Sequence, residues 1–253
     1  MLIHLQYQEK RYKADLSKPI DISIPLKEGS QTVNCFYAPL METFPVEAGT
    51  FIGSTQRGGP VNFLNVRLNP HGNGTHTECV GHISKEKITI NKTLQKFHYI
   101  AKVISVYPTK TESGDRVIFK SQIMEALAPN EVKALVIRTL PNDVLKQQTN
   151  YSGTNPPFLH HEATQYIVDC GIEHLLIDLP SVDREEDGGE LLSHKAFWQY
   201  PSSVRKNCTI SELIFVPNGI KDAFYLLNIG IASFEIDVSP SKPTLYELME
   251  SNS

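Results

Sequence analysis

The sequence predicts an α/β fold, built as one compact domain over residues 1–253. Two observations favour this class. A strand, a loop, a helix and a second strand follow one another from residue 133 to residue 180, which is the order of a βαβ unit. Strand-rich segments flank this unit on both sides, and nothing in the chain forces a boundary between two domains. We therefore expect a mixed sheet flanked by helices.

The βαβ unit is read from its hydrophobic pattern. Residues 133–141 form a continuous apolar run, as expected for a strand covered on both faces, and residues 174–180 form a second such run. Residues 142–157 are polar and contain Gly and Pro, which predicts a long loop. Residues 160–171 predict a helix that ends at Gly171. Its apolar face comprises Ala163, Tyr166, Ile167 and Cys170.

Four further segments flank the unit. Residues 20–26 alternate apolar and polar side chains, which predicts a half-buried strand. Residues 98–108 predict another strand, closed by a proline, and residues 121–129 predict a short helix. Near the C-terminus, residues 210–217 and 222–236 are rich in strand-forming residues.

Composition excludes several classes of function. The formal net charge is −4 and no basic run is present, which argues against nucleic acid or acidic lipid as a partner. No stretch approaches the roughly 18 apolar residues of a membrane span, and the first residues lack the apolar core of a cleaved signal peptide. The cysteines are far apart in sequence and fit reduced thiols, so we expect a cytoplasmic protein. They are Cys35, Cys79, Cys170 and Cys208.

Residues 69–82 hold three of the nine histidines together with a glutamate. If the segment from residue 76 runs extended, His76, Glu78 and His82 share one face, because side chains two apart point the same way. Two imidazoles and a carboxylate suit Zn²⁺, Mn²⁺ or Fe²⁺. The alternative is a solvated loop that happens to be rich in histidine.

Several motifs resemble those of the cyclase family of metal-dependent hydrolases, which includes kynurenine formamidase and isatin hydrolase. "GTHTECVGH" (74–82) resembles the family signature G-T-H-x-D-x-P-x-H, and "HLLIDLPSVD" (174–183) is similar to its G-I-D-x-P-S-V-D segment. The remaining matches occur in the same order as in the family: "ISIPL" (22–26), "LVIRTL" (135–140), "TISELI" (209–214) and "DVSPSKPTLYE" (237–247).

The resemblance implies roles for the matching residues. His76 and Glu78 fall on metal ligands, and His82 falls on the catalytic acid/base histidine. Glu212 falls on a downstream carboxylate ligand, which we also count with the catalytic residues, and His194 best matches a downstream histidine ligand. The family further implies an open, β-barrel-like core and a homodimer or homotetramer.

The chain departs from the family pattern in three places. Where the family has its first histidine, four residues before the second, this chain has Gly72, and the nearest histidine is His71. His71 would lie on the opposite face of a regular strand, so it can be a ligand only if the glycine-rich segment bulges or loops. Glu78 replaces the usual Asp, and Cys79-Val80 replaces Ala-Pro. By alternation, Cys79 should point away from the ligand face.

The resemblance, together with these residues, implies a metal-dependent hydrolase that opens an amide, formamide or lactam C–N bond in a small carbonyl compound. The expected cofactor is a divalent metal, Zn²⁺ first and Mn²⁺ second, which acidifies a bound water and polarises a carbonyl. His82 would exchange the proton, since imidazole titrates near neutral pH. An arylformamide such as N-formylkynurenine, or a ring amide such as isatin, is the substrate that the resemblance implies.

Two alternatives come from other classes. A non-catalytic binding protein on the same fold, with a degraded metal site, would explain the missing histidine at position 72. A cysteine hydrolase would use Cys79 instead. Asp178 or Asp183 could orient a ligand imidazole or could serve a turn, and Phe197 with Trp198 could line a pocket or belong to the core.

Overall fold

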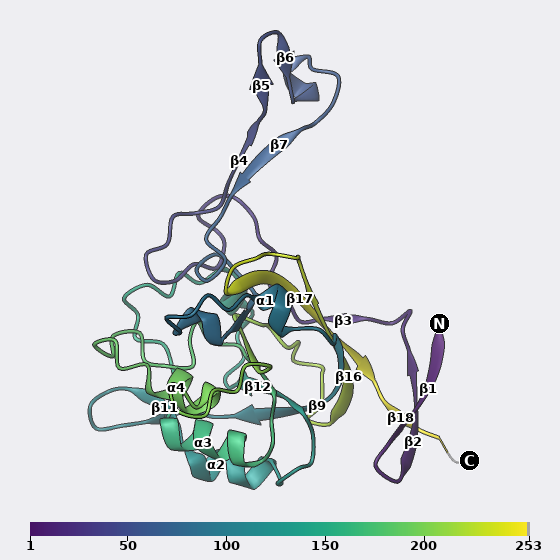
Figure 1. Ribbon diagram of the computed structural model, residues 1–253, viewed down its shortest axis with the longest axis vertical. Coiled ribbons are helices and arrows are strands. Elements are labelled where there is room, and N and C mark those ends of the chain that lie inside the picture. The colour runs from purple at the N-terminus through teal and green to yellow at the C-terminus, as the bar shows by residue number, and fades with distance from the viewer. Residues whose placement is uncertain (252–253) are drawn as a thin grey trace.

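A closed barrel of seven strands forms the centre of the computed structural model, which describes residues 1–251 (Figure 1). Neighbouring strands around the barrel are β16 (Phe224–Ile231), β9 (His98–Val106), β12 (Ala134–Thr139), β14 (His174–Ile177), β15 (Thr209–Glu212), β8 (His76–Cys79) and β17 (Val238–Glu247), which pairs again with β16. Strands β9, β12, β14 and β15 run parallel, and the others pair antiparallel. The predicted α/β class is confirmed, and the sheet closes where the family resemblance implied an open barrel.

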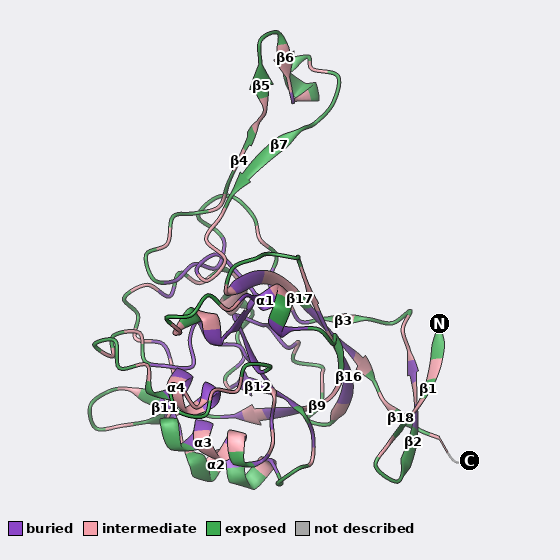
Figure 2. Ribbon diagram, viewed as in Figure 1, coloured by how far each residue is buried: buried purple, intermediate pink, exposed green. Residues whose placement is uncertain are grey.

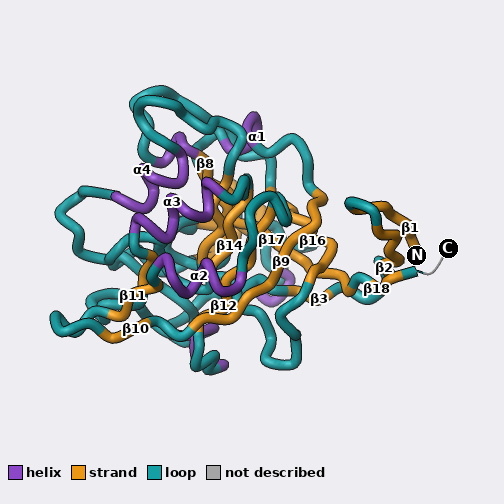
Figure 3. The backbone as a smooth tube through the Cα atoms, turned by 90° about the horizontal axis from the view of Figure 1, so that it is seen from below, coloured by secondary structure: helices purple, strands orange, loops and turns teal. Residues whose placement is uncertain are grey.

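Alternating side chains separate two cores. Ala134 and Val136 on β12 point into the barrel, whereas Leu135 and Ile137 on the same strand point outward. The outer face is covered by a layer of short helices, α2 (Lys120–Ala126), α3 (His161–Asp169) and α4 (Leu192–Trp198) (Figure 3). Both faces of β12 are buried, which explains why its sequence is a continuous apolar run. The strand predicted over 133–141 is therefore confirmed.

Most predicted elements are present. Strands β9, β12 and β14 and helices α2 and α3 lie where the pattern placed them, and Gly171 follows α3 with φ +80°. The prediction of a strand over 20–26 was largely wrong, because only β3 (Ile20–Asp21) is a strand there. In the segment 222–236, the strand ends at residue 231.

Strand β17 was missed in the sequence, although it is the longest strand. Pro240 and Pro243 lie within it, and proline normally argues against a central strand because it cannot donate a ladder hydrogen bond. Proline keeps its carbonyl acceptor, and the carbonyl of Pro243 accepts a hydrogen bond from the Ile22 amide at 3.1 Å.

Smaller elements complete the fold. Strands β1 (Leu2–Tyr7), β2 (Lys10–Asp15) and β18 (Met249–Glu250) form a sheet that holds the two ends of the chain together (Figure 1). A second small sheet contains β10 (Thr109–Lys110), β11 (Arg116–Ile118) and β13 (Phe158–Leu159). A short helix, α1 (Ile90–Thr93), packs near β8. None of the helices among residues 1–251 has the length and hydropathy needed to cross a membrane.

An arm projects from the body of the molecule (Figure 1). Its stem is the ribbon of β4 (Glu42–Pro45) and β7 (Leu64–Arg67), and its tip carries β5 (Glu47–Ala48), β6 (Phe51–Ile52) and a single 3₁₀ turn. Every residue of β7 is exposed (Figure 2). A two-stranded ribbon is at best marginally stable by itself, so the arm is the part of the fold with the least support.

Because His174 is buried at the start of β14, the free energy of unfolding should depend on pH. Its Nδ1 lies 2.8 Å from Thr209 Oγ1, and burial lowers the pKa of His174 to about 4 from 6.5. Between these values the unfolded chain binds a proton that the folded chain does not, so stability falls as the pH falls. From pH 7 to pH 5 this group should cost about 2 kcal/mol.

The measurement is urea unfolding at both pH values for wild type and His174→Gln, which keeps a polar group but does not titrate. The loss on acidification should be smaller in the variant by about 2 kcal/mol. His4→Gln, at an exposed histidine on β1, should behave as wild type. Equal losses in wild type and His174→Gln would contradict the assignment.

Candidate metal centre

Strands β8 and β15 supply the buried base of the histidine cluster. His76 and Glu78 project from the outer face of β8, and neither is exposed to solvent. The register pairs His76 with Glu212 on β15, and His76 Nε2 lies 3.3 Å from Glu212 Oε2. Cys79 points the other way, into the barrel core. The expected alternation is therefore observed over His76–Cys79, but the strand ends there, so the prediction of an extended run as far as His82 is wrong.

Helix α4 supplies the next ligand candidate. His194 Nε2 lies 3.2 Å from Glu78 Oε1 and 3.8 Å from Glu212 Oε1. On its other side, His194 Nδ1 lies 2.6 Å from Asp183 Oδ2. Asp183 also accepts hydrogen bonds from the backbone amides of Ser193 and His194, at the start of the helix. Asp183 thus fixes both the helix and the ring orientation of His194.

His71 joins the cluster through a turn. The Gly72 and Asn73 amides donate to the Asn69 carbonyl, which folds this segment out of strand geometry. A side chain at Gly72 would collide with Ala38, since its Cβ would lie 2.3 Å from the Ala38 Cβ. The turn brings His71 Nδ1 to 3.2 Å from Glu78 Oε2. The glycine-rich segment therefore loops as His71 requires, in spite of its odd spacing.

The open side of the cluster holds three half-buried groups. His82, on the 3₁₀ turn Val80–His82, has Nδ1 3.7 Å from Glu78 Oε2 and 3.5 Å from Asp237 Oδ2. Asp237 Oδ2 also lies 3.0 Å from His71 Nε2. Side-chain exposures of 26%, 31% and 29% for His71, His82 and Asp237 mark this as the side that solvent reaches.

Sequence reasoning missed Asp237. It lies immediately before β17, at the start of the segment 237–247, which was noted only for its resemblance to the family. Its place follows from the β17–β8 register, which pairs the next residue, Val238, with Glu78. That register depends on barrel closure, and no spacing within the sequence encodes it.

Burial and charge act against each other throughout this cluster. Burial would raise the pKa of Glu78, but the neighbouring imidazoles, His82 foremost, hold it well below its usual range. Burial would likewise lower the pKa of His194, but Asp183 and Glu78 raise it well above its usual range. The imidazoles therefore compensate the charge of the carboxylates, and a metal ion that bound here would displace protons from the imidazoles that become its ligands.

The side chains fit a divalent cation. His76 Nε2 and Glu78 Oε2 are buried atoms that make no well-directed hydrogen bond among residues 1–251, although Glu212 Oε2 lies 3.3 Å from the first and His71 Nδ1 lies 3.2 Å from the second. A buried polar atom without a hydrogen bond costs about 1–3 kcal/mol unless something else binds it. Three sets of side chains have ligand atoms within 4.8 Å of one another: His71–His76–Glu78, His71–His82–Asp237 and Glu78–His82–His194. Nitrogen and oxygen donors of this kind suit Zn²⁺ and Mn²⁺.

The other residues that the sequence singled out have structural roles. Asp178 pairs with Lys146 at 2.8 Å, so Asp183 is the aspartate that orients a ligand imidazole. Phe197 and Trp198 are fully buried core residues, although the Trp198 ring centre lies 5.5 Å from that of His194. Burial raises the pKa of the Cys79 thiol, which donates to the Ile88 carbonyl. A buried, protonated thiol is a poor nucleophile, which argues against the cysteine hydrolase.

A family model described as "Putative cyclase" matches residues 15–184, about two thirds of the chain. Solved structures share the fold at low sequence identity. A predicted metal-dependent hydrolase from Bacillus stearothermophilus is 16% identical, with a TM-score of 0.64 over 90% of this chain and 98% of that one. An isatin hydrolase bound to the product analogue thioisatinate is 16% identical, with a TM-score of 0.64 over 92% of this chain and 93% of that one.

Isatin hydrolase A from Labrenzia aggregata, bound to benzyl benzoate, is 10% identical and has a TM-score of 0.65 over 90% of this chain and 93% of that one. No curated protein sequence matches the chain.

Asp183→Asn should weaken metal binding without removing any proposed ligand. An asparagine carries no charge to compensate the His194 imidazole and offers one acceptor oxygen where the carboxylate offers two. We expect the affinity for Zn²⁺ to fall about 10- to 100-fold in a chelator competition titration. Glu190→Gln, at an exposed position of the same loop, is the matched control. Unchanged affinity in Asp183→Asn would contradict the positioning role.

Proposed function

Because the chain belongs to the cyclase family, we propose that it is a metal-dependent hydrolase that opens an amide, formamide or lactam C–N bond in a small carbonyl compound. The observation that carries this proposal is the pair of buried atoms without a hydrogen bond, His76 Nε2 and Glu78 Oε2, within a cluster of imidazoles and carboxylates whose ligand atoms lie within 4.8 Å of one another. A cation bound there would satisfy both atoms.

The proposed ligands are His71, His76, Glu78, His194 and Glu212, with Glu78 central because three imidazoles converge on it. Glu212 is held in place by a hydrogen bond from the Val182 amide at 2.9 Å. When bound, a divalent cation supplies Lewis acidity, which polarises a carbonyl group and acidifies water. We propose Zn²⁺ first and Mn²⁺ second.

His82 is the proposed acid/base residue. It lies on the exposed side of the cluster, where a substrate can reach it, whereas His76 and His194 are buried. Asp237 Oδ2, at 3.5 Å from His82 Nδ1, can hold the ring in one orientation. His82 would accept a proton from the attacking water and deliver one to the leaving nitrogen.

The substrate proposal comes from the relatives. A structural neighbour is an isatin hydrolase bound to a product analogue, so a ring amide is the first class to assay. An arylformamide is the second class. Both present a carbonyl carbon bonded to nitrogen, and the same cluster can serve either reaction.

The rival proposal of a binding protein with a degraded site loses its main support. That proposal rested on the glycine at position 72, yet the turn brings His71 to 3.2 Å from Glu78. The imidazole is therefore present in the cluster, although it comes from the neighbouring position.

The test is the metal content of purified protein, together with hydrolysis of isatin and N-formylkynurenine. Wild type should hold Zn²⁺ or Mn²⁺ near stoichiometry, and chelator should abolish activity. His76→Ala and Glu212→Gln remove ligands, so each should lose the metal and at least about 100-fold in activity, exceeding the usual effect of residues that only orient ligands. Cys79→Ala should keep both the bound metal and the activity of wild type. A wild-type protein that takes up neither ion would overturn the proposal.

We also propose that copies of the chain associate through the arm. Leu64 and Val66, on β7, are 49% and 55% exposed, and Phe63, immediately before β7, is 56% exposed. Two arms related by a two-fold axis would bury each other's apolar side chains, and two-fold dimers are the commonest assemblies.

Light scattering after size-exclusion chromatography tests the association. Wild type should run as a dimer or tetramer, and the double variant Phe63→Asp/Val66→Asp should run as a monomer. Met124→Asp changes a comparably exposed apolar residue, on α2 and outside the arm, and should keep the assembly. A monomeric wild type at all concentrations would rule out self-association.

A further inference from the structure

A cavity separate from the histidine cluster lies at the same edge of the barrel. It has a volume of about 530 Å³ and opens beyond the carboxyl ends of three parallel strands, where Tyr107 follows β9, Thr139 ends β12 and Leu179 follows β14. Ligands of α/β proteins bind at such edges, and pockets of about 300–1,000 Å³ hold small molecules. None of its lining residues belongs to the histidine cluster.

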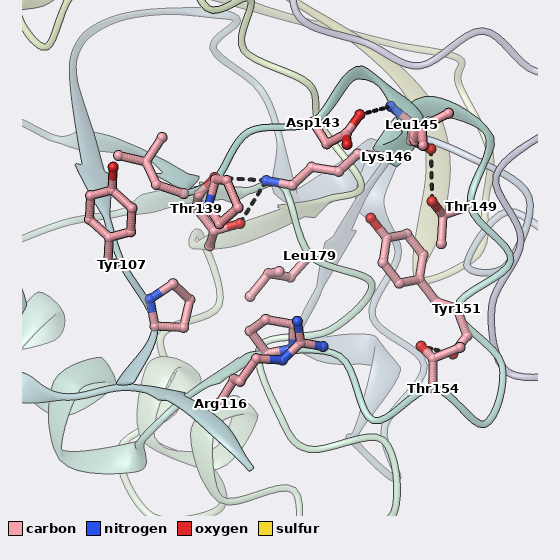
Figure 4. Close-up of a pocket in the computed structure, with 14 residues that line it drawn as sticks. Tyr107, Arg116, Thr139, Asp143, Leu145, Lys146, Thr149, Tyr151, Thr154 and Leu179 are labelled. Atoms are coloured by element: carbon pink, nitrogen blue, oxygen red, sulfur yellow. Dashed lines mark hydrogen bonds between the residues drawn. The ribbon is translucent and has the colours of Figure 1, made fainter. Parts of the chain in front are cut away.

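Tyr151 presents a free hydroxyl to this cavity. Its side chain is only 9% exposed, and its hydroxyl points into the cavity (Figure 4). The hydrogen bonds of Tyr151 within residues 1–251 involve its backbone, with Asn34 and Thr154 as partners. This hydroxyl is not among the buried atoms that lack a partner, so it is open to the cavity and available to a ligand.

Arg116 provides the available positive charge. Its guanidinium points inward in Figure 4, and the only hydrogen bond of its side chain among residues 1–251 is a long contact of 3.4 Å with the Asn155 carbonyl. Lys146 is already satisfied, because its Nζ contacts Asp178 Oδ2 at 2.8 Å and Thr139 O at 2.7 Å. Asp143 at the rim carries a negative charge, which disfavours a ligand with two anionic groups.

The remaining wall is apolar and contains flat rings. Proline rings offer faces on which an aromatic ring can lie, and leucines fill the spaces between them. The apolar residues are Pro108, Leu140, Pro141, Leu145, Pro157 and Leu179.

We propose that this cavity binds a small aromatic monocarboxylate. The carboxylate would pair with Arg116 and accept a hydrogen bond from the Tyr151 hydroxyl, while the ring lies against the proline and leucine wall. This binding does not depend on the hydrolase activity proposed above.

The cavity wall is continuous with the metal centre. Leu179 lines the cavity, and its carbonyl accepts a hydrogen bond from the Leu213 amide at 2.9 Å, next to Glu212. The segment that begins at Leu179 carries the Val182 amide, which donates to Glu212, and Asp183, which holds His194. A ligand that shifts this segment changes the affinity for the metal, and the metal changes the affinity for the ligand by the same factor. This coupling rests on the proposed metal site.

The binding experiment is calorimetric titration of metal-free protein with benzoate, so that the carboxylate cannot bind a metal. Benzamide, of the same shape but neutral, should bind at least about tenfold more weakly, since a hydrogen bond to a charged group is worth roughly one to two factors of ten. Arg116→Gln should lower benzoate affinity by at least about tenfold, and Tyr151→Phe by about three- to tenfold.

Lys110→Gln is the matched control, because Lys110 pairs with Arg116 across β10 and β11 but does not line the cavity. It should bind benzoate as wild type does. Equal binding of benzoate and benzamide, no binding of benzoate at millimolar concentration, or wild-type affinity in Arg116→Gln would each overturn the proposal. Arg116 is exposed, so its variant tests the site even if Tyr151→Phe fails to fold.

The coupling is tested by titrating Zn²⁺ with and without saturating benzoate, in wild type and in Arg116→Gln. Benzoate should change the Zn²⁺ affinity of wild type and leave that of the variant unchanged. An unchanged affinity in wild type would overturn the coupling alone. Failure of Zn²⁺ to bind at all would count against the hydrolase, while the metal-free titration would still decide the cavity.

Discussion

The Glu78 carboxylate is fully buried, and the proposed metal centre is organised around compensating its charge. A lone carboxylate at this depth would cost several kcal/mol. His71, His82 and His194 approach it from a turn, a 3₁₀ turn and a helix, each within 3.7 Å. Three separate segments of the chain thus each place an imidazole against the one carboxylate on β8.

Barrel closure decides which groups accompany that carboxylate. Strand β8 is paired on both sides, with β15 and with β17, and each register delivers one acid to the site. Glu212 arrives opposite His76, and Asp237 arrives beside the residue paired with Glu78. Because side chains alternate, both registers must be correct to the residue, since a slip of one would turn these acids away.

The parallel half of the barrel gives the fold its second feature. The carboxyl ends of β9, β12 and β14 leave a cavity beside the metal centre, and the segment after β14 borders both. The buried pair Asp178–Lys146 secures the start of this segment, with Asp178 accepting from the Thr139 amide on the adjacent strand. One short segment therefore supports a proposed metal ligand on one side and a cavity wall on the other.

The sequence by itself determined the elements and residues whose signals are local. Continuous apolar runs marked β12 and β14, and two-residue alternation placed His76 and Glu78 on one face with Cys79 opposite. Family resemblance added His194 and Glu212, which the structure brings to the same cluster. The metal and catalytic roles of these residues remain predictions.

The tertiary structure alone decided what depends on contacts between distant segments. Strand β17, and with it the position of Asp237, was not predicted because Pro240 and Pro243 lie within the strand. Proline has no N–H for the ladder, so a sequence that contains it argues against a central strand. His71 reached Glu78 only through a turn that its odd spacing could not specify. Register and closure arise from packing across the whole barrel, so no window of neighbouring residues can contain them.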